Sequence, residues 1–206
     1  MTDASVETDT TPAPTKEIKI ETTTEAPDGE EVESGDWYTY KERTEQDGKI
    51  RSYLTGRMVD AAIGNRRPIA IMMSNDKQAL PQYGINRAGV VYEVPVEGEM
   101  NRYMALIEDY DGLERIGSVR SARTCYTYFA REYDAIFAHY GQSTFAKKYL
   151  NNVDNINGLD GIGGTAYYRT KDRKAPHNAY TSGERVNKAI EKLGYKPNAI
   201  AQGLAL

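Results

Sequence analysis

The segment RPIAIMMSND, residues 67–76, holds an unbroken apolar run from Ile69 to Met73 between a proline and the polar triplet Ser-Asn-Asp. A short apolar run bounded in this way is typical of a buried strand. Two further strands are expected at residues 90–94 and at about 101–109. The second of these alternates side chains in the two-residue period of a strand and is closed by Asp111-Gly112.

Beyond Gly112 the apolar period changes to that of a helix. Residues 121–133 (SARTCYTYFAREY) carry apolar side chains at helical spacing, as expected for a half-buried helix. A strand is predicted in DAIFAHY, and two more helices at about 144–150 and at 181–193, the last ended by Gly194. Alternating strands and helices predict an α/β or α+β fold, a mixed β-sheet with flanking helices.

The other segments carry weaker signals. Residues 41–65 are expected to form an irregular lead-in, and residues 81–89 a loop. Residues 151–164 (NNVDNINGLDGIGG) and 171–180 are also predicted to be loops, with a short strand or sheet edge at 165–170 between them.

The chain divides by composition into an acidic N-terminal segment and a mildly basic remainder. Residues 1–36 hold 11 acidic and 2 basic residues and no aromatic residue. Such a segment buries too little apolar surface to offset its ordering entropy, so residues 1–40 are predicted to be a disordered Thr/Glu/Pro-rich linker before a domain at 41–206. The whole chain has 30 acidic and 26 basic residues, which leaves 19 and 24, a net charge of +5, from Trp37 onward.

Several functional classes lack their sequence signals. No dense run of lysine and arginine points to nucleic acid, and no apolar stretch has the length of a transmembrane helix or a signal segment. Cys125 is the single cysteine, so no internal disulfide is expected. There is no phosphate-binding glycine motif in a strand–helix context, and no cofactor is predicted.

The segment GSVRSART, residues 117–124, is the first candidate site. An extended segment turning into a helix there would point unpaired backbone N–H groups and the positive end of the helix dipole outward. Arg120 and Arg123, three apart around Ser121, could then approach one phosphate or carboxylate. The alternative is that both arginines pair with local carboxylates such as Glu132 or Glu114.

A second candidate is FAHYGQS, residues 137–143, where His139 ends a strand and Ser143 begins a helix. If the strands before the two segments run parallel, both loops open on the same side of the sheet, where ligands usually bind. The alternative is a His139 satisfied by a neighbouring backbone carbonyl.

The remaining candidates lie in KAPHN and YEVPVEGEMNR. The first supplies His177 and Asn178, and the second supplies Glu93, Glu97 and Arg102. The carboxylates and histidines lack any metal-ligand spacing, so no metal site is predicted.

In combination these motifs resemble the YerB-like family of Gram-positive lipoproteins, a domain of unknown function. The resemblance covers residues 53–194 and is carried by YLTG, RPIAIMMSN, PQYGINRAGVVYE, VEGEMNRYMAL, IGSVRSAR, EYDAIFAHYGQS and APHNAYTS. The chain departs from the family pattern at Gly89, where an acidic residue is expected, and at Gln142, where a second glycine is expected.

The resemblance implies an exported protein, held at the cell membrane by a lipid on a cysteine upstream of the acidic linker. That cysteine is absent from this sequence, as is the smaller C-terminal domain that family members tend to carry. The family brings no established reaction.

Three functions are therefore open. The leading hypothesis is an extracytoplasmic domain that binds an anionic ligand, such as a phosphate- or carboxylate-bearing envelope component, in a cleft lined by arginine and histidine. The second is a phosphoryl or glycosyl-phosphate hydrolase or transferase, in which His139 or His177 serves as acid or base with Glu93 or Glu97 as partner. The third is a scaffold for an envelope protein. The expected ligand-binding residues are Asn75, Glu93, Arg102, Arg120, Ser121, Arg123, Ser143 and Asn178, and the expected catalytic ones are Glu97, His139 and His177.

Overall fold

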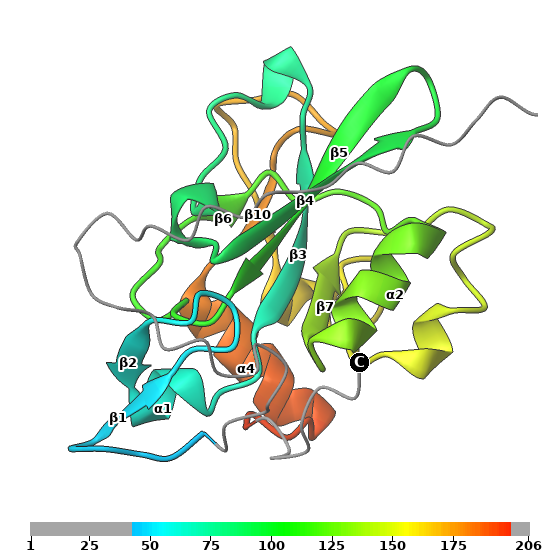
Figure 1. Cartoon of the computed structure of the whole chain (residues 1–206). Coiled ribbons are helices and arrows are strands. Elements are labelled where there is room, and N and C mark those ends of the chain that lie inside the picture. The colour runs from blue at the N-terminus through cyan, green and yellow to red at the C-terminus, as the bar shows by residue number, and fades with distance from the viewer. Residues whose placement is uncertain (1–42, 199–206) are drawn as a thin grey trace, which may run out of the picture. The chain divides into compact units, whose positions relative to one another are not determined.

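The apolar run at residues 69–73 forms the central strand of a five-stranded mixed sheet (Figure 1). In the computed structural model, which describes residues 43–198, β3 (Ile69–Ser74) pairs antiparallel with β5 (Met100–Ile107) and parallel with β7 (Ile136–His139). The outer strands are β4 (Val90–Val96), antiparallel to β5, and β8 (Asn155–Asn157), parallel to β7. The predicted mixed sheet with flanking helices is confirmed as an α+β fold. The linker predicted at residues 1–40 lies outside the described residues.

Both faces of this sheet are covered, which explains why β3 is apolar from Ile69 to Met73. Ala70 and Met72 pack in one cluster with Tyr126 and Ala130 of α2 (Thr124–Glu132). Ile69, Ile71 and Met73 pack on the opposite face, in a cluster with Val186, Ala189 and Ile190 of α4 (Gly183–Leu193). The sheet is therefore the middle layer between two helices.

The predicted helix at 181–193 is confirmed as α4, and its ends have local causes. The Ser182 hydroxyl accepts a hydrogen bond from the Arg185 N–H at 3.3 Å and caps the first turn. Gly194 ends the helix with a φ of 71°, a left-handed conformation that favours glycine.

A second, three-stranded antiparallel sheet contains β6 (Ile116–Gly117), β10 (Ala179–Thr181) and β9 (Tyr168–Arg169), with β10 in the centre. The smaller elements are the hairpin β1 (Lys49–Arg51) and β2 (Met58–Asp60), the helices α1 (Ala61–Gly64) and α3 (Gly163–Ala166), and the 3-10 turns η1 (Lys77–Ala79), η2 (Ile85–Arg87) and η3 (Leu150–Asn152). None of the helices within residues 43–198 has the length and apolar character needed to cross a membrane.

Four sequence-based predictions are wrong in detail. Residues 41–65 are not an irregular lead-in, since they contain β1, β2 and α1. The helix expected at 144–150 is replaced by turns that run into η3. The predicted loop at 151–164 contains β8 and the start of α3, and the loop at 171–180 contains the start of β10. Strand β8 has the sequence Asn-Ile-Asn, so it has no apolar run from which it could be predicted. It is a strand because its backbone pairs with β7.

Candidate functional site

The segments GSVRSART and FAHYGQS lie side by side at the carboxyl ends of the parallel strands β3 and β7. The Arg120 N–H donates to the Met72 carbonyl at 3.0 Å, and the Tyr140 N–H donates to the Arg120 carbonyl at 3.0 Å. The Ala122 N–H in turn donates to the Gly141 carbonyl at 2.9 Å. These bonds place residues 120–122 beyond the strand ends, where α/β sheets commonly bind ligands.

We predicted that GSVRSART and FAHYGQS would open on the same side of the sheet because the strands before them run parallel, and this reason is wrong. The strand before GSVRSART does not run parallel to β7 in the main sheet, since β6 belongs to the second sheet and pairs antiparallel with β10. The two loops meet because the chain leaves β6 and passes directly between the ends of β3 and β7.

Three arginines converge on this position from two elements. Arg102 comes from β5, where it lies opposite Ser74, and its buried Nη1 donates to the Ser121 carbonyl at 2.7 Å. Arg123 donates to the same carbonyl at 3.2 Å and to the Ala122 carbonyl at 3.0 Å. We call Arg102, Arg120 and Arg123 the arginine cluster.

The pKa shifts indicate that the cluster carries closely spaced positive charge. The pKa of Arg102 is lowered to about 10, mainly by burial and then by the charges of Arg123 and Arg120. Burial also lowers the pKa of Arg120, followed by the charge of Arg123, with Asp76 opposing both.

Glu97 is the carboxylate that directly pairs with the cluster among residues 43–198. It lies in the three-residue connection between β4 and β5, where it accepts two hydrogen bonds from Arg123, one of them from Nε at 2.8 Å. The bond from Arg123 is the main cause that lowers the pKa of Glu97 to about 2. Glu97 therefore stays ionised at neutral pH and is a poor general acid.

Arg120 has an unused hydrogen-bond donor. Its Nη1 is buried and finds no partner anywhere in the described part of the chain. The hydroxyl of Ser118, two residues earlier, is likewise buried and unpaired within residues 43–198. Buried polar groups without partners are rare in folded proteins, so these two atoms are places where water or a ligand can supply the missing bond.

His177 lies close enough to Arg120 for their charges to interact. Its side chain comes from the loop before β10, which is tied to the arginine segment by the Val119 N–H donating to the Ala179 carbonyl at 2.8 Å. The residue is 8% exposed, and the described residues offer its Nδ1 no partner. Burial, then the charge of Arg120, lowers the pKa of His177, so its ring is neutral at pH 7.

His139 is placed differently from the expectation. It is fully buried, with Nδ1 at 2.7 Å from the Gly141 carbonyl and Nε2 at 3.2 Å from Oδ1 of Asn155. Burial lowers its pKa. Both ring nitrogens face acceptor oxygens inside the domain, and a neutral ring can donate to only one of them, so His139 positions the loop after β7 and reaches no open surface.

The other expected site residues make bonds within the domain. Asn75 donates to Glu93 at 3.2 Å, and Ser121 donates through Oγ to the Tyr140 carbonyl at 3.0 Å. Ser143 accepts from the Ala146 N–H at 3.2 Å. Asn178 accepts from Arg169 at 2.7 Å. Of the expected set, the structure therefore groups Arg102, Arg120, Ser121, Arg123, Glu97 and His177.

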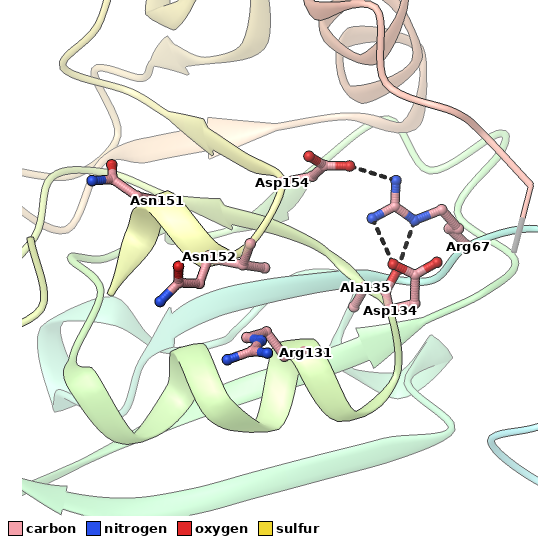
Figure 2. Close-up of a pocket in the computed structure, with 8 residues that line it drawn as sticks. Arg67, Arg131, Asp134, Ala135, Asn151, Asn152 and Asp154 are labelled. Carbon is pink, nitrogen blue, oxygen red and sulfur yellow. Dashed lines mark hydrogen bonds and ion pairs between the residues drawn. The ribbon is translucent and has the colours of Figure 1, made fainter. Parts of the chain in front are cut away.

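Sequence reasoning missed a second polar centre at the amino ends of the parallel strands. Arg67, directly before Pro68 and β3, is 5% exposed. It donates to Oδ1 of Asp134 at 3.0 Å and to Oδ2 of Asp154 at 2.7 Å (Figure 2). A hollow of about 380 Å³ adjoins these residues, with Arg131, Asn151 and Asn152 also lining it. Because the two aspartates precede β7 and β8, Arg67 ties together the starts of three strands. The sequence signal that could have revealed this centre is the position of Arg67 directly before Pro68 and the central strand.

No group of three or more histidine, cysteine or acidic side chains suited to a metal ion occurs within residues 43–198. The hydrogen-bond donors that gather at the ends of β3 and β7 are cationic or neutral side chains. They suit an oxyanion.

Fold and site together define the class of protein: an α+β domain with a cationic cluster at the carboxyl ends of its parallel strands. Residues 54–196 match the family described as "Protein of unknown function (DUF3048) N-terminal domain", and the chain belongs to this family.

Two comparisons agree with the family match. The chain is 38% identical over 150 residues to "Putative lipoprotein YerB" of Bacillus subtilis (strain 168), covering 72% of this chain and 45% of that protein. The crystal structure of YerB protein from Bacillus subtilis is similar with a TM-score of 0.68 and 37% identity, over 72% of this chain and 51% of that one. The chain thus spans about half the length of the relatives it matches.

Proposed function

We propose that the domain binds an anionic ligand, a phosphate- or carboxylate-bearing component of the cell envelope, through the arginine cluster. Arg120 would donate to the ligand oxygens with its free Nη1, and the neutral His177 would add a hydrogen bond from the second sheet. Arg102 and Arg123 would supply the surrounding positive potential.

The unpartnered Nη1 of Arg120 is the observation that carries this proposal. A buried guanidinium nitrogen without an acceptor costs free energy, which an incoming oxyanion would recover. The cluster has three positive charges, whereas Glu97 pairs with Arg123 alone. Charge complementarity therefore favours an anion over a neutral ligand.

The extracytoplasmic, lipid-anchored location is part of the same proposal. Its support is the Bacillus subtilis relative, which is named a putative lipoprotein. A ligand of the cell envelope is consistent with that location.

The enzymatic alternative gains no support from the described residues. His139 is buried with both nitrogens facing oxygens inside the domain, and Glu97 is held ionised by Arg123. His177 is left without the carboxylate partner expected for acid–base catalysis, because Glu93 bonds to Asn75 and Asn101.

Calorimetric titration of the whole chain with inorganic phosphate and pyrophosphate tests the proposal. Since hydrogen bonds to charged groups contribute about 1.5–3 kcal/mol, Arg120→Gln should weaken binding by at least about tenfold. Arg87→Gln is the matched control, because Arg87 is an exposed arginine that pairs with Asp109 and takes no part in the cluster. Equal binding by both variants, or no binding of either anion by the wild type, would contradict the proposal.

A further inference from the structure

A second surface of the domain combines exposed aromatic and basic side chains. Phe145 is 82% exposed and Tyr128, on α2, is 52% exposed. Lys147 and Lys148 are exposed beside Phe145. We call Tyr128, Phe145, Lys147, Lys148 and Tyr149 the Phe145 patch; the turns that carry most of it lie next to α2 (Figure 1).

The patch is held in a defined shape. Ala146 and Leu150 are buried under it, and the Tyr149 N–H donates to the Ala146 carbonyl at 2.9 Å. The rings of Tyr128 and Tyr149 are 5.6 Å apart, which ties the turns to α2. Phe145 is therefore displayed outward on a fixed turn while its neighbours in the chain anchor the backbone.

The charge around the patch has one sign. A hollow of about 670 Å³ is lined by Phe145, Lys147, Lys148, Tyr149 and three uncharged polar residues, with no carboxylate among them. The adjacent hollow, the one beside Arg67, is lined by Asp134 and Asp154, but both carboxylates are paired with Arg67. Arg131 also lines that hollow (Figure 2). Neither lysine of the patch forms an ion pair with another residue in the described range.

We propose that the Phe145 patch docks the domain on the surface of an anionic lipid bilayer. An exposed aromatic ring can enter the boundary between headgroups and acyl chains, while lysines beside it contact anionic headgroups through their flexible stems. Charge complementarity selects an anionic surface, and the single protruding ring suits a fluid interface better than a preformed protein groove. This inference goes beyond the anion site and rests on none of its residues.

Flotation of the whole chain with phosphatidylcholine vesicles, with and without phosphatidylglycerol, tests the docking surface. The wild type should float with the anionic vesicles and be released at high salt, because salt screens the lysine charges. Each lysine near an anionic surface changes partitioning by about fivefold, so Lys147→Gln/Lys148→Gln should lower it about twenty-five-fold. Phe145→Ser should lower it about tenfold through lost apolar contact.

Matched controls separate the patch from general effects. Lys188→Gln/Lys192→Gln removes two lysines from α4, and Met58→Ser removes an exposed apolar side chain that is 43% exposed on β2. Both should bind vesicles like the wild type.

Three results would overturn the proposal. The first is equal binding by the wild type and the patch variants, including no binding by either. The second is equal binding to neutral and anionic vesicles. The third is loss of binding in Arg120→Gln alone, which would assign headgroup contact to the arginine cluster. Thermal melts of the patch variants should match the wild type, since the altered side chains are exposed.

Discussion

Glu97→Gln should increase the affinity of the arginine cluster for phosphate. In the structure the Glu97 carboxylate occupies Arg123 with two hydrogen bonds, so it acts as a resident anion that an incoming ligand must displace or share. Glutamine keeps the size of the side chain and removes its charge, which makes Nε and Nη2 of Arg123 available to the ligand.

The magnitude follows from the Glu97–Arg123 pair. A pKa lowered from 4.5 to about 2 would correspond to roughly 3 kcal/mol for a pair shielded from water. The Glu97 side chain is 65% exposed, so water and salt screen the pair, and about 1 kcal/mol is the appropriate value. Removing that competition should lower the phosphate dissociation constant by about fivefold.

Titration calorimetry at neutral pH and low ionic strength measures this change. Glu99→Gln is the control, because Glu99 is exposed in the same connection and forms no ion pair within residues 43–198, yet its replacement changes the net charge equally. If Glu97→Gln binds phosphate no more tightly than Glu99→Gln, then Glu97 does not compete with the ligand and the reasoning is refuted. Weaker binding would instead show that Glu97 positions Arg123.

Three further predictions concern stability and are measured by urea unfolding. Gly183→Ala should lose about 3 kcal/mol, because an added Cβ would lie 2.0 Å from the Tyr110 carbonyl oxygen, whereas Gly161→Ala, with open space around it, should be nearly neutral; equal losses would contradict this. Arg67→Met should lose about 2 kcal/mol, because it removes a buried guanidinium that bonds to the half-exposed Asp134 and Asp154 carboxylates and to two backbone carbonyls, and a loss below about 1 kcal/mol, as for an exposed pair, would show that Arg67 does not tie the strands together. Burial lowers the pKa of His139 below that of the unfolded chain, so the unfolded state takes up the proton first as the pH falls from 7 toward 5. The free energy of unfolding should therefore fall by up to about 1.4 kcal/mol per pH unit from this group, and His139→Gln should show a shallower pH dependence; an unchanged slope would be evidence against a neutral buried ring.

The strongest periodic segments were predictable because their patterns have a local cause. The run at 69–73 is apolar throughout since both sheet faces are covered, and the 181–193 helix has a serine cap and a terminal glycine that act within a few residues. Arg120 and Arg123 were also singled out from sequence, because their three-residue spacing before a helix would let them approach one anion; the anion site itself stays a prediction. His139 could not be assigned, since a histidine at a strand end is equally compatible with an open site and with a buried ring that faces oxygens inside the domain.

By itself, the sequence determined the central strand, two further strands within residues 90–109, the flanking helices and the presence of an arginine-rich turn. These features follow from side-chain periodicity and from capping, which act over one or two turns of chain. Only the tertiary structure decided that β6 joins a second sheet, that Arg102 and His177 approach Arg120, and that Asn-Ile-Asn forms a strand. Each of these depends on backbone hydrogen bonds between segments far apart in the chain, such as the one from Val119 to Ala179. No local pattern records which distant segment will supply such a partner.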